Sequence, residues 1–309
     1  MISRRNIRVK VMQALYAIRA EEGKALVMGD AKRLLTKHFD QTISLFTWLI
    51  YVIVETARYA ETDAHLKASK HRPTAEDLNV PTKIAGNELL WKMRESPFYK
   101  EAVAEYKPRL DDNDDWIKKL YTQLLESTPY AVYNTEQGRD KKSEREILEY
   151  IFTDLMLANE SFTDSAEYQY NNWDDDADML RLLVMHFLQK PNSFKVDDMI
   201  SREKREFARL LLETTEERKE QLAELIKPKL RNWDADRIAL LDMILMEMGT
   251  AEFLYFETIP PKVTINEYID LAKAYSTPQS GQFVNGILDN IRKDLEANNQ
   301  LNKVAYKKA

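Results

Sequence analysis

The sequence of 309 residues contains no cysteine. This absence excludes disulfide bonds, zinc sites with thiolate ligands, iron–sulfur clusters held by cysteine and any cysteine nucleophile. A chain without thiols suits a reducing compartment, because disulfide-stabilised proteins are mostly extracellular. We therefore expect a cytoplasmic protein.

Glycine is also scarce, with seven residues in the whole chain. Few glycines, 31% charged residues and abundant leucine, alanine, glutamate and lysine favour helices over a β-sandwich or barrel. A chain of this length buries roughly three quarters of its unfolded surface, enough for one large domain or two modest ones. The composition predicts an all-α fold.

No hydrophobic run is long enough to cross a bilayer. The most apolar segment, Ile43 to Val54, has 12 residues and is interrupted by Ser44 and Thr47, whereas a span needs roughly 18. At the N-terminus, Lys10 and Arg19 interrupt the apolar run that a signal peptide would need. We expect a buried helix at Ile43 to Val54 and no membrane partner.

The motifs of several common enzyme classes are absent from the sequence. It has no Gly-x-x-x-x-Gly-Lys phosphate loop, no Gly-x-Gly-x-x-Gly turn and no Gly-x-Ser-x-Gly elbow. Acids at helical spacing are numerous, but no second element singles out a catalytic pair. We expect no enzymatic activity and no cofactor.

Two aspartate-rich stretches suggest metal binding but fail on inspection. The stretch Asp111 to Asp115 resembles the opening of an EF-hand loop, yet Trp116 and Thr122 stand where such a loop needs glycine and glutamate. A second stretch from Asp174 fails the same test, and the four histidines lack metal-ligand spacing. We expect no metal site, and both acidic stretches suit helix starts.

Charge is segregated along the chain, although the net charge is only −6. The first 20 residues hold five basic residues and no acid, whereas Glu160 to Asp178 holds seven acids and no lysine or arginine. Basic and acidic segments of this kind point to different partners more directly than the net charge does.

The basic N-terminal segment has the periodicity of an amphipathic helix. Its apolar residues fall on one arc of a helical wheel, with Arg5, Arg8 and Arg19 on the flank of that arc beside Met12 and Tyr16. An arginine-rich edge with an aromatic ring can bind phosphates and stack on unpaired bases. The alternative is a solvated helix flank, because surface arginines are common.

Two helices are predicted between Pro260 and the last residues of the chain. Thr264 and Glu267 have the spacing of a capping box at the start of the first helix, followed by an apolar face. The second helix carries an apolar stripe from Phe283 onward. Gly286 lies inside that helix, where glycine costs about 1 kcal/mol relative to alanine, so we expect a close neighbour there.

Several words in these segments resemble a known family. Ile265-Asn266-Glu267, Leu271-Ala272-Lys273 and Phe283-Val284-Asn285-Gly286 resemble the C-terminal signature of the NusB family of transcription antitermination factors. At the other end of the chain, Arg4-Arg5-x-x-Arg8 followed by Gln13-Ala14-Leu15-Tyr16 resembles the arginine-rich first helix of that family. The match joins several words in order at both ends of the chain.

The resemblance implies a NusB-like helical bundle interrupted by a large helical insertion. On this basis the first helix of the core covers residues 1–22, the insertion 23–196, the remainder of the core 197–297 and a tail 298–309.

The resemblance also implies a function. The chain would bind boxA-like single-stranded RNA together with NusE, a small-subunit ribosomal protein, in the RNA polymerase antitermination complex that transcribes ribosomal RNA operons. Asp242 aligns with an acid that faces NusE in the family, although an exposed helical aspartate is by default a solvated charge. The implied RNA-binding residues are Arg4, Arg5, Arg8, Tyr16, Gln279, Ser280, Gln282 and Phe283.

Other interpretations remain at this stage. Phe283 opens an apolar stripe, so it could be a core residue and nothing more. The protein could also be an adaptor that keeps the fold, has lost RNA binding and acts through its acidic insertion. A NusB-like domain also precedes the catalytic domain of some RNA cytosine methyltransferases, but that class needs a nucleotide-binding sheet and a cysteine that this sequence lacks. A helical scaffold unrelated to NusB is a third interpretation.

Overall fold

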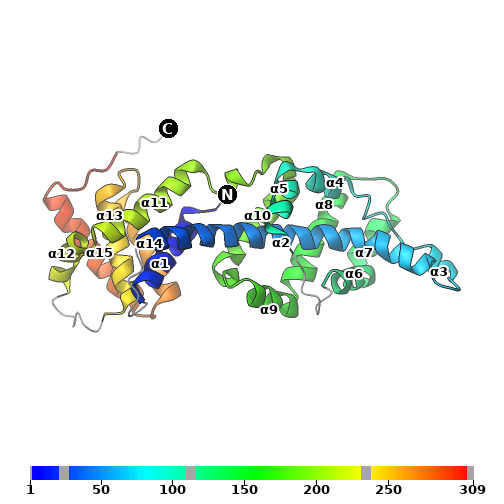
Figure 1. Ribbon diagram of the computed structural model, residues 1–309, viewed down its shortest axis with the longest axis horizontal. Coiled ribbons are helices and arrows are strands. Elements are labelled where there is room, and N and C mark those ends of the chain that lie inside the picture. The colour runs from blue at the N-terminus through cyan, green and yellow to red at the C-terminus, as the bar shows by residue number, and fades with distance from the viewer. Residues whose placement is uncertain (1, 21–27, 109–115, 231–237, 305–309) are drawn as a thin grey trace. The chain divides into compact units, whose positions relative to one another are not determined.

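The structure is a computed structural model that describes residues 2–20, 28–108, 116–230 and 238–304. Within these ranges the regular elements are helices, and no strand occurs (Figure 1). The prediction of an all-α fold is confirmed. The chain divides into two compact units: unit 1 contains residues 40–200, and unit 2 combines residues 2–39 with the chain from Ser201 onward.

Unit 1 contains most of α2 (Met28–Ala68), whose first residues belong to unit 2. Its other helices, several of them short, follow in order along the chain. They are α3 (Ala75–Leu78), α4 (Glu88–Glu95), α5 (Pro97–Tyr106), α6 (Trp116–Glu126), α7 (Thr128–Thr135), α8 (Lys141–Tyr150), the π-helix η1 (Ile151–Leu157), α9 (Glu160–Gln169), α10 (Trp173–Gln189) and the 3-10 turns η2 (Pro191–Ser193) and η3 (Asp197–Met199).

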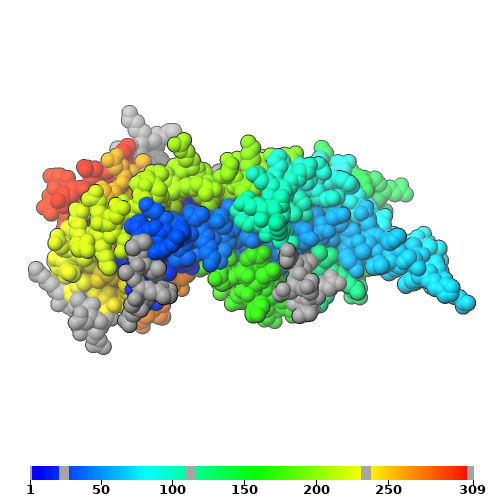
Figure 2. All heavy atoms as spheres, in the orientation of Figure 1, coloured from blue at the N-terminus to red at the C-terminus, as the bar shows by residue number. Residues whose placement is uncertain are grey.

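Aromatic rings on α2 form the centre of the unit 1 core. Phe46 lies 5.3 Å from Phe98 of α5 and 6.0 Å from Phe187 of α10, measured between ring centroids. Trp48 stacks on Phe162 of α9 at 5.2 Å. Such pairs contribute about 0.5–1.5 kcal/mol each beyond the burial of their area. In the space-filling view, helices of unit 1 flank α2 and leave part of it at the surface (Figure 2).

Helix α2 contains a long apolar stretch. One 18-residue window in this helix is long and apolar enough to cross a membrane, but 72% of that window is buried inside the protein. The core helix of a globular domain meets the same criterion, so the window is weak evidence for a membrane span. The buried helix predicted at Ile43 to Val54 is confirmed, since Leu49 and Ile50 have almost no exposed surface.

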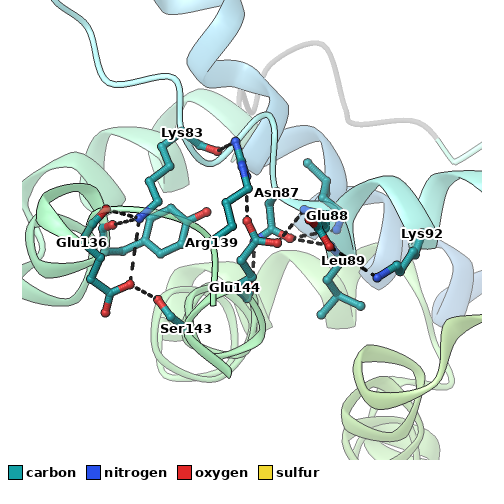
Figure 3. A network of polar contacts seen from close by, with 11 residues as sticks. Lys83, Asn87, Glu88, Leu89, Lys92, Glu136, Arg139, Ser143 and Glu144 are labelled. Carbon is teal, nitrogen blue, oxygen red and sulfur yellow. Dashed lines mark hydrogen bonds and ion pairs between the residues drawn. The ribbon is translucent and has the colours of Figure 1, made fainter. Parts of the chain in front are cut away.

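A polar network holds α4 against α8 in unit 1 (Figure 3). The buried Glu144 carboxylate accepts a hydrogen bond from the Arg139 guanidinium at 2.6 Å and one from the backbone N–H of Glu88 at 2.7 Å. Asn87 caps α4 with its side-chain oxygen and donates its amide N–H to the Glu144 carbonyl at 2.7 Å. These hydrogen bonds satisfy the buried carboxylate and fix the start of α4 against α8.

Helix starts in unit 1 follow local sequence rules. Pro97 is the first residue of α5, with Ser96 as its N-cap. The N-cap of α8 is Asp140, whose carboxylate accepts from the amides of Lys142 and Ser143. The aspartate satisfies both of these amides at the helix start, so α8 begins at Lys141.

Unit 2 contains α1 (Arg4–Ala20) and the C-terminal helices. These are α11 (Arg202–Glu217), α12 (Lys219–Ile226), the 3-10 turn η4 (Lys227–Lys229), α13 (Leu240–Tyr255), α14 (Pro261–Tyr275) and α15 (Ser280–Ala297).

Ion pairs at both ends of α1 fix its direction against α11. Arg4, at the start of α1, binds Glu203 at the start of α11 at 2.5 Å. Arg19, near the end of α1, binds Glu216 near the end of α11 at 2.8 Å. The two helices therefore run parallel. Their ion pairs hold the N-terminal helix against the C-terminal part of the chain.

The close packing expected at Gly286 occurs at another glycine. A Cβ on Gly286 of α15 would meet nothing within 4 Å. A Cβ on Gly249 of α13 would lie 2.9 Å from both Leu288 methyl carbons and 3.3 Å from the Tyr268 ring. The expectation at Gly286 was wrong, and Gly249 is a position where helices approach too closely for an unadjusted side chain.

Candidate nucleic-acid interface

Arg4 and Arg5 project from the first turn of α1 beside a cavity of about 530 Å³. Arg4 is 38% exposed, and Arg5 is 45% exposed with its guanidinium 3.4 Å from the Asp270 carboxylate. Exposed pairs of this kind contribute about 0–1 kcal/mol, so an incoming anion can replace either carboxylate. The cavity is lined by Ser3, Arg4, Arg5, Arg8, Thr258, Ile259, Pro260, Val263 and Glu267.

Arg8 differs from its neighbours because its side chain is only 3% exposed. Its guanidinium donates to both oxygens of the buried Glu252 carboxylate, from Nε at 2.6 Å and from Nη2 at 3.1 Å. A third donor, Nη1, binds Glu267 at 3.2 Å. Burial lowers the pKa of Arg8, but Glu252 raises it through its charge and hydrogen bonds, and the net pKa shift is upward.

The Glu252 carboxylate is the centre of this buried cluster. Besides Arg8, it accepts hydrogen bonds from the Thr264 hydroxyl at 3.1 Å and the Tyr268 hydroxyl at 2.9 Å. Burial raises the pKa of Tyr268 well above its ordinary value, and the Glu252 charge raises it further. The cluster ties α1, α13 and α14 together.

Two sequence expectations change at this cluster. Arg8, expected to bind an RNA phosphate, has its guanidinium occupied by carboxylates inside the unit. Thr264 and Glu267, expected as a capping box, bind Glu252 and Arg8 and do not cap a helix start. The helix begins earlier, at Pro261. A buried carboxylate and a buried guanidinium need partners more than an exposed helix end does.

Arg19, which shares the flank of α1 with Arg5 and Arg8, is also turned inward. Its guanidinium binds Glu247 of α13 at 2.5 Å and Glu216 of α11. Burial raises the pKa of Glu247, and the charge of Arg19 offsets part of that shift. Of the three arginines on the predicted edge, Arg5 alone is exposed.

Tyr16 lines a second cavity, of about 480 Å³, on unit 2. Tyr16 is 45% exposed, so its ring is accessible to a flat group. The cavity is formed by α1, the start of α13 and the end of α14. Its lining residues are Met12, Gln13, Tyr16, Ala239, Leu240, Leu241, Tyr275, Ser276 and Thr277.

The residues around the start of α15 divide into surface and interior positions. Gln279 and Gln282 are exposed, and Phe283 is half-buried. Ser280 is buried, and its hydroxyl donates to the Asp242 carboxylate at 2.8 Å. Gln279, Gln282 and Phe283 can therefore contact a ligand directly, whereas Ser280 positions the start of the helix.

Asp242 lies in the first turn of α13 and is 6% exposed. The sequence led us to expect this acid to face a basic partner. In the structure its carboxylate instead accepts from Ser280, whose hydroxyl also meets Ser276 at 3.0 Å and Thr277 at 2.9 Å. The aspartate joins the start of α13 to the turn between α14 and α15.

Metal binding has no support in the part of the chain that the structure describes. No group of three or more histidine, aspartate or glutamate side chains is placed to hold an ion there. Residues 111–115, the stretch with an EF-hand-like opening, lie outside the described ranges.

Comparison with known proteins decides the family. A sequence profile of the NusB family matches residues 168–293. The transcription antitermination protein NusB of Salinibacter ruber is 46% identical over 99 residues, which are 32% of this chain and 62% of that protein. The chain contains a NusB-family domain.

Two further NusB proteins give the extent of the match. The protein of the same name from Methylacidiphilum infernorum is 49% identical over 78 residues, 25% of this chain and 54% of the relative. A solved structure of T. maritima NusB has 32% identity, covers 34% of this chain and 80% of that chain, and has a TM-score of 0.30. The chain thus spans about half to three fifths of the lengths of the Methylacidiphilum and Salinibacter proteins.

Sequence reasoning missed the buried partners of the arginines in α1. Glu252 and Glu247 lie in α13, five residues apart in a helix that is otherwise almost wholly buried. Two acids inside an apolar helix are a signal, since a buried carboxylate requires a cation or several donors. The first 20 residues contain arginines but no acid. Two of these arginines, Arg8 and Arg19, are the cations that meet this requirement.

Proposed function

We propose that this chain is a transcription antitermination factor that holds boxA-like single-stranded RNA together with NusE in the transcription of ribosomal RNA operons. It acts by assembly in the cytoplasm, within an RNA polymerase complex, and not by catalysis. The NusB core comprises residues 1–22 and 197–297, residues 23–196 are an insertion, and residues 298–309 are a tail.

The support for RNA binding lies in the exposed cations and flat side chains of unit 2. Arg4 and Arg5 are half-exposed beside one cavity, and Tyr16 is half-exposed in another. Guanidinium groups bind phosphates through bidentate hydrogen bonds, and a tyrosine stacks on a base independently of the base sequence. Gln279, Gln282 and Phe283 complete the set of direct contacts, while Arg8 and Ser280 hold the surface in place.

The proposed contact with NusE uses the start of α13 on unit 2. Because Asp242 is buried with Ser280, it would act by fixing the backbone of this surface and not through a free charge. The relatives' printed name, transcription antitermination protein, supports the general function, and the role of NusE is part of the proposal.

Fluorescence anisotropy with a labelled boxA-like RNA, with and without NusE, tests the function. Each phosphate contact made by a single strand lowers the logarithm of affinity by about 0.7 per tenfold rise in salt. The double variant Arg4→Ala/Arg5→Ala should therefore flatten the slope by roughly 1.4. Arg8 is left intact in this variant because its removal would leave the buried Glu252 carboxylate without its counter-charge.

Control measurements separate loss of binding from loss of structure. Lys227→Ala, in the exposed η4 turn, removes one surface charge and should leave the salt slope unchanged. Absence of RNA binding by the folded wild type, with NusE present, would overturn the function.

A second candidate is an adaptor that has lost RNA binding, and the charge of the two units favours it. Unit 1 holds 19 basic and 30 acidic residues, a net charge of −11, whereas unit 2 holds 26 basic and 21 acidic residues, a net charge of +5. An acidic unit of this size suits a basic protein partner. The RNA measurement above distinguishes the two candidates.

A further inference from the structure

The chain changes direction at the end of α15. Asn299 has a left-handed backbone with φ 55°, a conformation that asparagine tolerates better than most residues. The backbone N–H of Gln300 donates to the Leu295 carbonyl at 2.8 Å and closes the turn. The residues that follow leave the line of α15 and contact another helix of unit 2. The NusB-family match, which ends at residue 293, does not include this turn.

The helix that the tail contacts is α13, whose C-terminal end has no cation of its own. The last turn of α13 contains no basic residue, although a helix C-terminus carries a partial negative charge and leaves carbonyl groups without helical partners. Lys303 supplies this cation from the tail. Its ammonium group donates to the carbonyl oxygens of Glu252 at 2.9 Å and Phe256 at 2.7 Å.

A backbone contact and burial also hold the tail in place. The backbone N–H of Val304 donates to the Glu257 carbonyl at 3.2 Å. Lys303 is half-buried. Burial lowers the pKa of Lys303, and the charges of Glu252 and Glu257 offset part of that shift. Three backbone carbonyls at or directly after the end of α13 thus have donors from the tail.

The contacts of the tail precede a turn that belongs to the proposed RNA surface. Residues 258–260 follow the last of these carbonyls, and all three line the cavity beside the exposed arginines of α1. The Phe256 carbonyl that binds Lys303 also accepts the backbone N–H of Ile259 at 3.2 Å. Lys303 therefore shares an acceptor with the turn that forms one wall of the cavity.

Glu252 connects the tail to α1 as well. Its carboxylate binds the buried Arg8 guanidinium, and its backbone carbonyl binds Lys303. The cavity wall and helix α1 are therefore both anchored at the end of α13, where the tail is docked.

We propose that Lys303 is a positioning residue for RNA binding, which holds the turn at residues 256–260 and helix α1 in the arrangement that the RNA meets. The inference rests on the proposed RNA-binding function and adds the C-terminal tail to it. Because its ammonium group is bound to carbonyl oxygens, Lys303 acts through the turn and not as a phosphate contact.

The substitution Lys303→Met tests this role, because it removes the charge and keeps an unbranched side chain. Hydrogen exchange of the full chain should become faster in residues 252–260. If the surface is then competent for only about a tenth to a third of the time, the affinity for boxA-like RNA falls about three- to tenfold. The salt slope should not change, whereas loss of a phosphate contact would flatten it by about 0.7.

Two further variants control for the change of side chain. Lys303→Arg keeps a cation at the end of α13 and should retain most of the affinity that Lys303→Met loses. Lys293 lies on α15 with its side chain 61% exposed. Lys293→Met makes the same chemical change away from α13, so it should leave both the exchange of residues 252–260 and the RNA affinity close to those of the wild type.

The outcomes separate this role from the general function. Wild-type exchange of residues 252–260 in Lys303→Met, or unchanged RNA affinity in that variant while the wild type binds RNA, would overturn the positioning role and leave the RNA function standing. A salt slope flattened by about 0.7 in Lys303→Met would show a direct phosphate contact and would also overturn it. A folded wild type that binds no RNA overturns both.

Discussion

The arginines of α1 are of two kinds. Arg8 and Arg19 are buried in ion pairs that stabilise unit 2, whereas Arg4 and Arg5 are partly exposed. Arg8 is the main example of the first kind, because it neutralises the buried Glu252. We expect Arg8→Met to lower the free energy of unfolding by about 3–5 kcal/mol, since it leaves a buried carboxylate without its counter-charge. Urea unfolding followed by circular dichroism measures this loss.

Matched variants control for the loss of an arginine as such. Arg5→Ala removes a half-exposed cation and should cost no more than about 1 kcal/mol. Arg8→Met/Glu252→Met removes both buried charges and should recover much of the stability lost in Arg8→Met alone. If Arg8→Met proved no more destabilising than Arg5→Ala, the buried pair would not contribute as described.

The buried partners of Arg8 and Ser280 could not be predicted from the sequence. A helical wheel correctly predicts that Arg5 and Arg8 lie on the flank of an apolar arc, but it contains no information on what packs against that flank. Glu252 lies 244 positions from Arg8, so no local pattern reveals the pair. The same limit applies to Ser280, whose burial depends on Asp242 in another helix.

At the scale of elements, most helix positions could be predicted and several ends could not. Apolar periodicity predicted a helix in each of the segments now seen as α1, α14 and α15, because burial of one face decides where a helix forms. The start of α14 lies three residues before Thr264, because that threonine is used in the core. Helix ends depend on such competition between local caps and distant partners.

Helix packing in unit 2 gives a prediction that compares two glycines. Gly286→Ala should raise the free energy of unfolding by about 0.5–1 kcal/mol, because the position is helical and its surroundings are open. Gly249→Ala should lower it by about 1–3 kcal/mol, because the new methyl group overlaps the Leu288 methyls between α13 and α15. Thermal and urea unfolding of the two variants check these opposite signs. A loss of stability in Gly286→Ala would indicate a close neighbour that the structure does not show.

The whole molecule combines two units with separate cores and opposite net charge. The charge of −11 in unit 1 and +5 in unit 2 makes unit 2 the more attractive unit for the anionic ligand that we propose. The segregation was visible in the sequence as an acid-free N-terminus and a base-free stretch from Glu160. The spatial grouping was not, because α1 joins helices that follow Ser201 through ion pairs with α11 and α13.

Separate cores predict that each unit can be destabilised with limited effect on the other. Trp48 stacks on Phe162 inside unit 1, and Phe253 is fully buried in unit 2. Either residue changed to alanine should cost about 3–5 kcal/mol locally, because the lost packing lies within one contiguous core. Hydrogen exchange measured by mass spectrometry should show Trp48→Ala lowering protection in residues 40–200 and Phe253→Ala lowering it in residues 201–304.

RNA binding should persist in Trp48→Ala under conditions where unit 2 stays protected. Uniform loss of protection across both units in either variant would show that the chain unfolds as one cooperative body, and the continuous α2 helix would then be the element that couples them.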